Sequence, residues 1–230
     1  MPKLPGGPIA RRQLHFIFIA DCSASMAGEK IHALNNAIRE SIPHMRKAAD
    51  GEPNAEVVVK AVKFSSGATW HVSKATPVRD FEWIDLSADG QTDMGRALGL
   101  VTDALKTPPM PENGLPPLLV LISDGQPTDD FNAGLKALMS EPWGKKSVRI
   151  SIAIGSDADR SVLQKFIGDP ERTPLDAKNA PDLVACIKWA STVALRVVSS
   201  PKSSPQGAPN SGSVSLPPSP MPSANIDDVW

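Results

Sequence analysis

The sequence has few cysteines, no long apolar segment and almost no net charge. Its two cysteines, Cys22 and Cys186, stand far apart, so neither a disulfide framework nor a zinc-binding spacing is present. A formal net charge of -1 over 230 residues gives no generally basic surface, which argues against a nucleic-acid partner. No apolar run reaches the roughly 18–20 residues that cross a bilayer, so we expect no membrane partner.

The two ends of the chain differ in composition from its middle. Residues 1–13 are rich in proline and glycine and lack the apolar stretch and cleavage site of a secretory signal, so we expect a cytoplasmic protein. Ser, Pro and Gly supply 17 of the 26 residues from 200 to 225, too little apolar surface to offset the entropy of ordering. We therefore expect an N-terminal extension at 1–12, one domain at 13–198, and a flexible tail at 199–230. The apolar residues 226–230 fit either a short docking peptide or a frayed terminus.

Short apolar runs alternate with helical periodicities between these ends. We expect strands at 15–20, 55–64, 118–122 and 147–154, with 68–72 pairing as an antiparallel edge strand. Helices are expected at 29–47, 93–106, 131–139, 160–166 and 183–197, the first with a kink or an early end at Pro43. This alternation predicts an α/β, doubly wound fold. Its central sheet is mostly parallel, with one antiparallel edge strand and helices on both faces.

Oxygen-bearing side chains follow the two strongest strands. Asp21, Ser23 and Ser25 come after the first, Asp124 comes after 118–122, and Thr92 precedes a helix between them. The carboxyl ends of neighbouring parallel strands meet at one edge of a sheet, where ligands bind. Two carboxylates and three hydroxyls suit Mg²⁺, Mn²⁺ or Ca²⁺ rather than zinc or copper. The alternative is ordinary loop and helix-capping chemistry.

These five residues resemble the metal-ion-dependent adhesion site of von Willebrand factor A (VWA) domains. The pattern Asp-x-Ser-x-Ser, then Thr, then Asp is matched in order, and Ser-Asp-Gly follows an apolar strand at 123–125. The resemblance spans about residues 13–198 and implies a Rossmann-like fold. It also implies hydroxyls that reach the metal directly or through water, aspartates that often act through bridging water, and an acidic ligand group that fills the open position.

A narrower resemblance concerns residues 121–129, Leu-Ile-Ser-Asp-Gly-Gln-Pro-Thr-Asp. This segment is similar to bacterial TerY-type proteins of tellurium-resistance and stress systems, which are often encoded beside a protein kinase and a metal-dependent phosphatase. We therefore expect a metal-dependent protein-binding module whose partner, such as a kinase or phosphatase, presents a carboxylate or phosphate. Asp93, Gln126 and Asp129 flank the site and are candidates for contacting that partner.

Two other functions compete with this hypothesis. A Mg²⁺-dependent phosphatase or phosphotransferase also places an aspartate after the first strand, but phosphatases of the haloacid dehalogenase type carry a second aspartate where Ser23 stands. Cys22 lies in the same loop, yet no histidine is placed to activate it. We therefore predict no catalytic residue and no enzyme activity. The remaining alternative is a structural module with a vestigial metal site.

Overall fold

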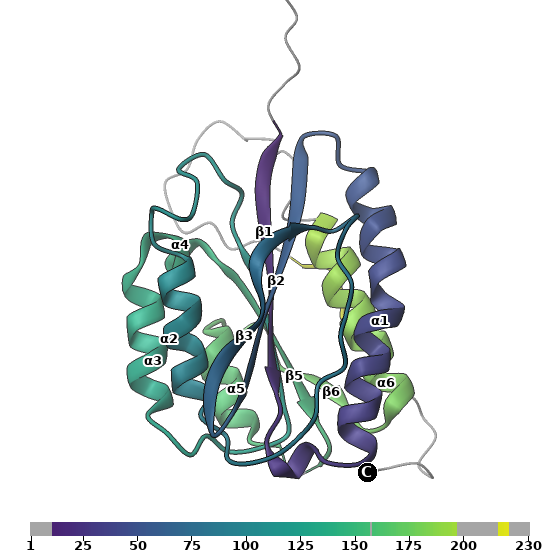
Figure 1. Ribbon diagram of the computed structural model, residues 1–230, viewed down its shortest axis with the longest axis vertical. Helices are drawn as coiled ribbons and strands as arrows, with labels where there is room; N and C mark the ends of the chain where they lie inside the picture. The colour runs from purple at the N-terminus through teal and green to yellow at the C-terminus, as the bar shows by residue number, and fades with distance from the viewer. Residues whose placement is uncertain (1–10, 157, 197–215, 221–230) are drawn as a thin grey trace, which may run out of the picture.

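The computed structural model describes residues 11–156, 158–196 and 216–220 (Figure 1). Its core is a six-stranded sheet with the order β3-β2-β1-β4-β5-β6. The β2–β3 pair is antiparallel and the other four pairs are parallel, which confirms the predicted fold class. The strands are β1 (Arg12–Asp21), β2 (Ala55–Ser65), β3 (Gly67–Pro77), β4 (Leu118–Ser123), β5 (Val148–Ile154) and β6 (Leu175–Ala177).

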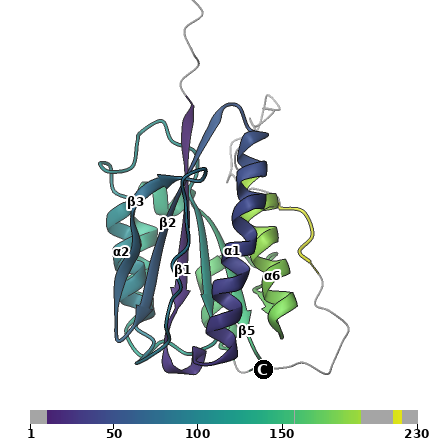
Figure 2. The same ribbon diagram turned by 45° about the vertical axis from the view of Figure 1, so that its right-hand side comes forward.

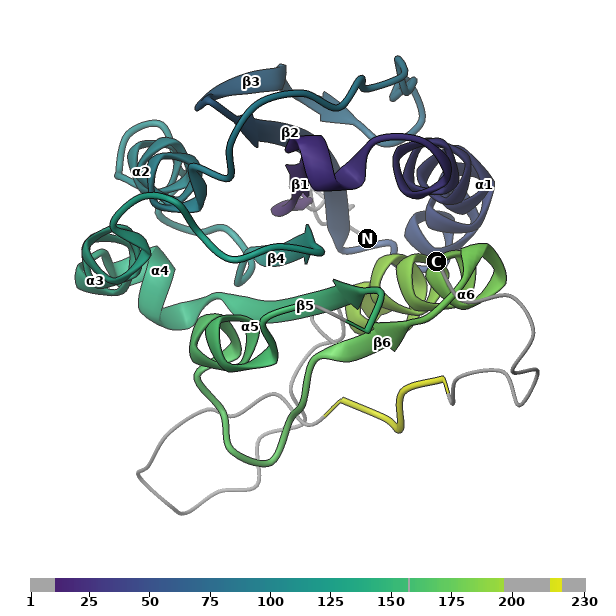
Figure 3. The same cartoon turned by 90° about the horizontal axis from the view of Figure 1, so that it is seen from below.

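Helices cover both faces of the sheet. Figures 2 and 3 show α1 and α6 on one face, and Figure 3 shows α2, α3 and α5 on the other. The predicted helices are confirmed, whereas α4 and β6 were not predicted because they are too short to show a periodicity. No helix in the described part of the chain is long and apolar enough to span a membrane. The helices are α1 (Glu29–Asp50), α2 (Met94–Ala104), α3 (Phe131–Ser140), α4 (Pro142–Lys146), α5 (Arg160–Ile167) and α6 (Ala180–Trp189), with a 3-10 turn at Ala24–Met26 and a π turn at Ala190–Ala194.

The central strand β1 is mostly apolar between Leu14 and Ala20 because both of its faces are covered. Phe16 and Phe18 pack into the cluster beneath α1 and α6, while Ile17 and Ile19 pack into the cluster beneath α2, α3 and α5. From β1 the chain goes to β2 on one side and later to β4 on the other. The order therefore reverses between β1 and β4, and their carboxyl ends form the crevice where such sheets bind ligands.

Helix α1 does not end at Pro43. The prediction of an early end there is wrong, since the helix continues to Asp50. Pro43 is on the exposed side of the helix, where water can hydrate the carbonyl that loses its backbone partner. The opposite side of α1 buries Ile38, Ile42 and Met45 in the core, and this tertiary packing outweighs the local preference of proline.

Candidate metal centre

Three loops meet at the carboxyl ends of β1 and β4, at the lower end of the sheet in Figure 1. The loop after β1 is tied to the loop before α2 by two backbone hydrogen bonds. The amide of Ala24 donates to the carbonyl of Gly90 (3.0 Å), and the amide of Asp89 donates to the carbonyl of Cys22 (2.8 Å). Gly28, with a φ of 82°, then turns the chain into α1. The predicted site residues are therefore held by backbone contacts between segments far apart in sequence.

Three of the predicted donors are linked through the hydroxyl of Ser25. The Oγ atoms of Ser23 and Ser25 are 3.0 Å apart, and Ser25 Oγ donates to Asp124 Oδ1 at 2.7 Å. Neighbouring oxygens around octahedral Mg²⁺ stand about 2.9 Å apart, because each lies about 2.1 Å from the ion. The spacing of these oxygens therefore fits the shell of a small hard cation.

Thr92 faces the same point. A Cβ atom added to Gly125 would stand 3.5 Å from Thr92 Oγ1 and 3.6 Å from Ser25 Oγ, so both hydroxyls converge on this glycine. The backbone of Thr92 is fixed by Thr128. The amide of Thr92 donates to Thr128 Oγ1 and the amide of Thr128 donates to the carbonyl of Thr92, each at 3.0 Å. Thr128 carries no local signal in the sequence, because its role depends on a contact between separate loops.

Asp21 lies beneath the hydroxyls and is fully buried. Its Oδ1 accepts the amide of Ser23 at 2.8 Å, and its Oδ2 accepts the hydroxyl of Ser123. Burial raises the pKa of the Asp21 carboxyl above its ordinary value. Since both oxygens are taken by the protein, Asp21 supports the site by holding the Ser23 loop and by its charge.

Asp124 has a partner that the sequence did not indicate. Lys30, in the first turn of α1, places its Nζ 2.6 Å from Asp124 Oδ2. The Asp124 side chain is fully buried and that of Lys30 is 14% exposed. One oxygen of Asp124 thus faces a lysine while the other faces Ser25. An ion at this site would share the Asp124 charge with Lys30.

Two of the three flanking candidates make hydrogen bonds within the domain. Asp93 accepts the Gly67 amide (2.8 Å) and the Thr128 hydroxyl (3.0 Å). Asp129 accepts the amides of residues 95 and 96, both at 2.8 Å, and so caps the first turn of α2. These carboxylates thus help to hold the scaffold together, and their contact with a partner stays a prediction. Gln126 is exposed next to Gly125, and its contact with a partner stays a prediction.

The surrounding side chains do not offer a different chemistry. Cys22 is buried, and burial raises the pKa of its thiol to about 12, so it carries no thiolate near neutral pH. Within the described residues, no group of three or more His, Cys, Asp or Glu is arranged to hold a metal. The donors at the candidate site are oxygen atoms, most of them in hydroxyls, and hard cations take oxygen ligands.

Solved structures with a similar fold come from several kinds of organism. A von Willebrand factor type A protein from Catenulispora acidiphila superimposes with a TM-score of 0.60 and 18% identity, over 80% of this chain and 43% of that one. The ArnB paralog VWA2 from Sulfolobus acidocaldarius gives 0.57 and 17%, over 77% and 44%. Proximal thread matrix protein 1 from the mussel byssus, with a zinc-occupied MIDAS motif, gives 0.60 and 16%, over 81% and 46%.

These similarities establish the fold, and this chain spans less than half the length of each of the three proteins. No curated protein matches the sequence. The family model for the von Willebrand factor type A domain matches residues 16–185, which include all five predicted metal ligands and most of the chain. The chain therefore belongs to the von Willebrand factor type A domain family.

Proposed function

We propose that this protein is a metal-dependent binding module, an adhesion or scaffold domain that captures an acidic or phosphorylated group of a partner protein through a divalent cation. The observation that carries the proposal is the contact among Ser23, Ser25 and Asp124, whose oxygens are spaced like ligands of one hard ion. They lie at the switch point of the sheet, where α/β folds of this topology bind ligands.

The roles of the residues follow from their contacts. Ser23, Ser25, Thr92 and Asp124 would hold the ion, and Asp21 would orient the Ser23 loop beneath it. A bound Mg²⁺, Mn²⁺ or Ca²⁺ supplies positive charge that attracts an anionic oxygen. Asp124 accepts the Ser25 hydroxyl, and Lys30 already neutralises part of its charge. The ion would therefore keep a net attraction for a carboxylate or phosphate from outside.

The biological setting that we propose is more specific than the binding function itself. The resemblance of residues 121–129 to TerY-type proteins supports a bacterial, cytoplasmic partner from a tellurite- or stress-resistance system, with a protein kinase or a metal-dependent phosphatase as the first candidates. We propose Mg²⁺ as the ion. The zinc found in the mussel protein belongs to that protein, and it makes zinc a necessary comparison in any binding measurement.

An array of peptides tests the proposal directly. Peptides that carry Asp, Glu or phosphoserine are compared with matched Asn, Gln or Ser peptides, in the presence of Mg²⁺, Mn²⁺, Zn²⁺ or EDTA. Binding of the full chain should require an anionic residue and a divalent ion, and Thr92→Ala should abolish it. Thr69→Ala is the matched control, because Thr69 is an exposed threonine on β3, which β2 separates from β1.

Two results would contradict the proposal. The first is peptide binding that survives both EDTA and Thr92→Ala in a folded protein. The second is hydrolysis of p-nitrophenyl phosphate that depends on Asp21, which would favour a phosphatase. The surroundings of Asp21 do not favour that activity, since its carboxyl is fully buried and both of its oxygens accept hydrogen bonds from the protein.

A further inference from the structure

One short piece of the Ser/Pro-rich tail lies on the domain. Residues 216–220, Leu-Pro-Pro-Ser-Pro, run beside α6 and β6 (Figures 2 and 3). For these five residues the structure differs from the expected flexible tail. Residues 226–230, the predicted docking peptide, lie outside the described residues.

Specific contacts hold this segment. Leu216 packs against the core cluster beneath α1 and α6, as does Trp189 at the end of α6. The indole Nε1 of Trp189 donates a hydrogen bond to the carbonyl of Pro218 at 3.1 Å. Leu216 thus supplies an apolar contact with the core, and Pro218 supplies a carbonyl that accepts from Trp189. Trp189 can serve such a segment because its indole has an apolar ring and a polar N–H donor.

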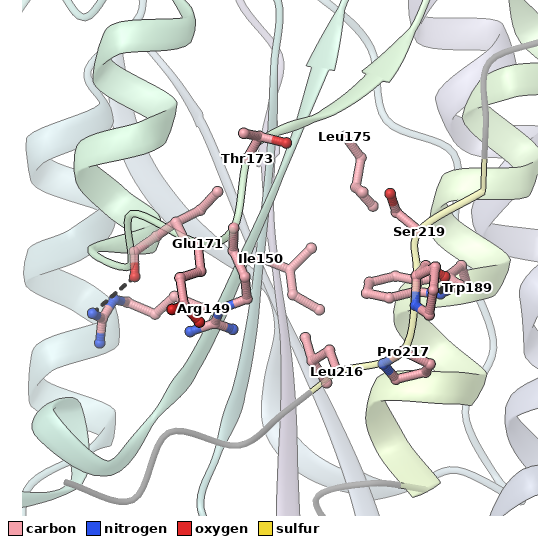
Figure 4. Close-up of a pocket in the computed structure, with 12 residues that line it drawn as sticks. Arg149, Ile150, Glu171, Thr173, Leu175, Trp189, Leu216, Pro217 and Ser219 are labelled. Carbon is pink, nitrogen blue, oxygen red and sulfur yellow. Dashed lines mark hydrogen bonds between the residues drawn. The ribbon is translucent and has the colours of Figure 1, made fainter.

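The segment borders a cavity of about 230 Å³. Figure 4 shows Pro217 and Ser219 beside Trp189, with Arg149 and Glu171 across the cavity. The hollow is thus formed partly by the domain and partly by the tail.

The far wall of the cavity is fixed by the domain itself. The guanidinium of Arg149 donates to the carbonyls of Phe166 (2.6 Å) and Ile167 (3.0 Å) at the end of α5. Arg172 lines the same cavity, and its Nη1 is buried with no hydrogen-bond partner among the described residues. The Arg149 side of the cavity is therefore held by contacts within the domain, and Arg172 keeps a donor for a further carbonyl oxygen.

A proline-rich strand suits such a groove for physical reasons. Proline lacks a backbone N–H and favours an extended polyproline conformation, so it loses little entropy on binding and leaves its carbonyls free to accept. Grooves that recognise such strands are lined by aromatic side chains. The tail places prolines at 217, 218 and 220 after Leu216, and Trp189 supplies the aromatic donor.

We propose that this groove is a recognition site for proline-rich segments of the Leu-Pro-Pro type, and that residues 216–220 of the same chain occupy it. The groove includes Arg149 and Ile150, which lie beside the start of β4 in the sheet. The candidate metal ligand Asp124 follows the end of β4. The two sites lie toward opposite ends of the sheet. A proline-rich partner would bind only by displacing the tail, whether or not a metal is bound.

Competition by a free peptide tests this proposal in the full-length protein. A fluorescein-labelled peptide that copies residues 214–222 is titrated by anisotropy against three chains: the wild type, a released variant with Leu216→Ser and Pro218→Ala, and a control variant with Pro209→Ala. A segment attached to the same chain competes with the free peptide at an effective concentration of about 1 mM. If the peptide binds the released variant with a Kd of about 100 µM, it should therefore bind the wild type about tenfold more weakly. The control should match the wild type, and EDTA should change none of the values.

A further substitution examines the hydrogen bond. Trp189→Phe in the released variant keeps an aromatic ring and removes the N–H, so the peptide should bind several-fold more weakly. If that variant does not fold, the indole ¹⁵N–¹H resonance of Trp189 provides a second measurement, since it should shift between wild type and released variant. Equal peptide binding by wild type and released variant would overturn the proposal, as would no binding to the released variant. A wild-type dimer that dissociates on Leu216→Ser would assign the occupant to a second copy and overturn the intramolecular part.

Discussion

Replacing Lys30 should change metal affinity and metal-free stability in opposite directions. Lys30 Nζ stands 2.6 Å from Asp124 Oδ2 in the candidate site, and both side chains are shielded from water. In Lys30→Met the apolar stem remains and the ammonium is lost. Without metal, Asp124 then keeps a buried charge with no lysine beside it. With metal, the same carboxylate becomes fully available to the ion.

The size of each effect can be worked out from this geometry. A dication bound on the Oδ1 side of Asp124 would lie roughly 6 Å from Nζ, where it is repelled by about 1.4 kcal/mol even at the dielectric constant of water. Removing the ammonium should therefore tighten the Kd for Mg²⁺ or Mn²⁺ by about tenfold or more. The metal-free protein should lose about 1–3 kcal/mol of unfolding free energy, between the values for exposed and buried ion pairs.

Isothermal titration with Mn²⁺ measures the affinity, and urea unfolding in EDTA measures the stability. Lys30→Arg keeps the charge and should resemble the wild type in its affinity. Lys47→Met is the matched control, because Lys47 is exposed in the last turn of the same helix. It removes a lysine without touching Asp124, so both quantities should stay near wild type.

One result would refute this reasoning. If Lys30→Met binds Mn²⁺ as weakly as the wild type or more weakly, the lysine does not compete with the ion for Asp124. Its role would then be to orient the carboxylate, and the charge argument for an anion-seeking metal would lose its support.

Three further predictions concern the rest of the domain. Burial lowers the pKa of His15 to about 4, so the unfolded chain binds a proton at a higher pH than the folded protein does. The unfolding free energy should therefore fall by about 3 kcal/mol from pH 6.5 to pH 4. In urea titrations, His15→Leu should remove this loss. Gly134→Ala should lower the unfolding free energy by about 1–3 kcal/mol, because the new Cβ would stand 2.6 Å from the carbonyl oxygen of Gly95. Gly99 has open space around it, so Gly99→Ala should raise the unfolding free energy by about 0.5–1 kcal/mol. Thermal unfolding measures both. Cys22, whose pKa burial raises to about 12, should react with a thiol reagent only after unfolding, and rapid labelling of the native protein would contradict this.

Local sequence patterns were sufficient to predict most of the strands and helices. The apolar run of β1 and the alternation in β5 reflect short-range periodicities, which follow from how a strand presents side chains to the two faces of a sheet. The motif positions were also local, since Asp21, Ser23 and Ser25 follow one strand and Asp124 follows another. Pro43 was misjudged because its effect depends on which side of α1 faces water, and that depends on the packing of the helix.

The sequence by itself indicated most of the strands and helices, the mostly parallel sheet and five candidate oxygen donors, because these depend on residue type and spacing. Only the tertiary structure decided which atoms those donors contact. The Lys30–Asp124 pair joins residues 94 positions apart, and Ser123 reaches Asp21 across 102 positions. It also assigned Asp93 and Asp129 to the scaffold and placed Leu216 on the core. Such contacts arise from packing between distant segments, so no local spacing contains them.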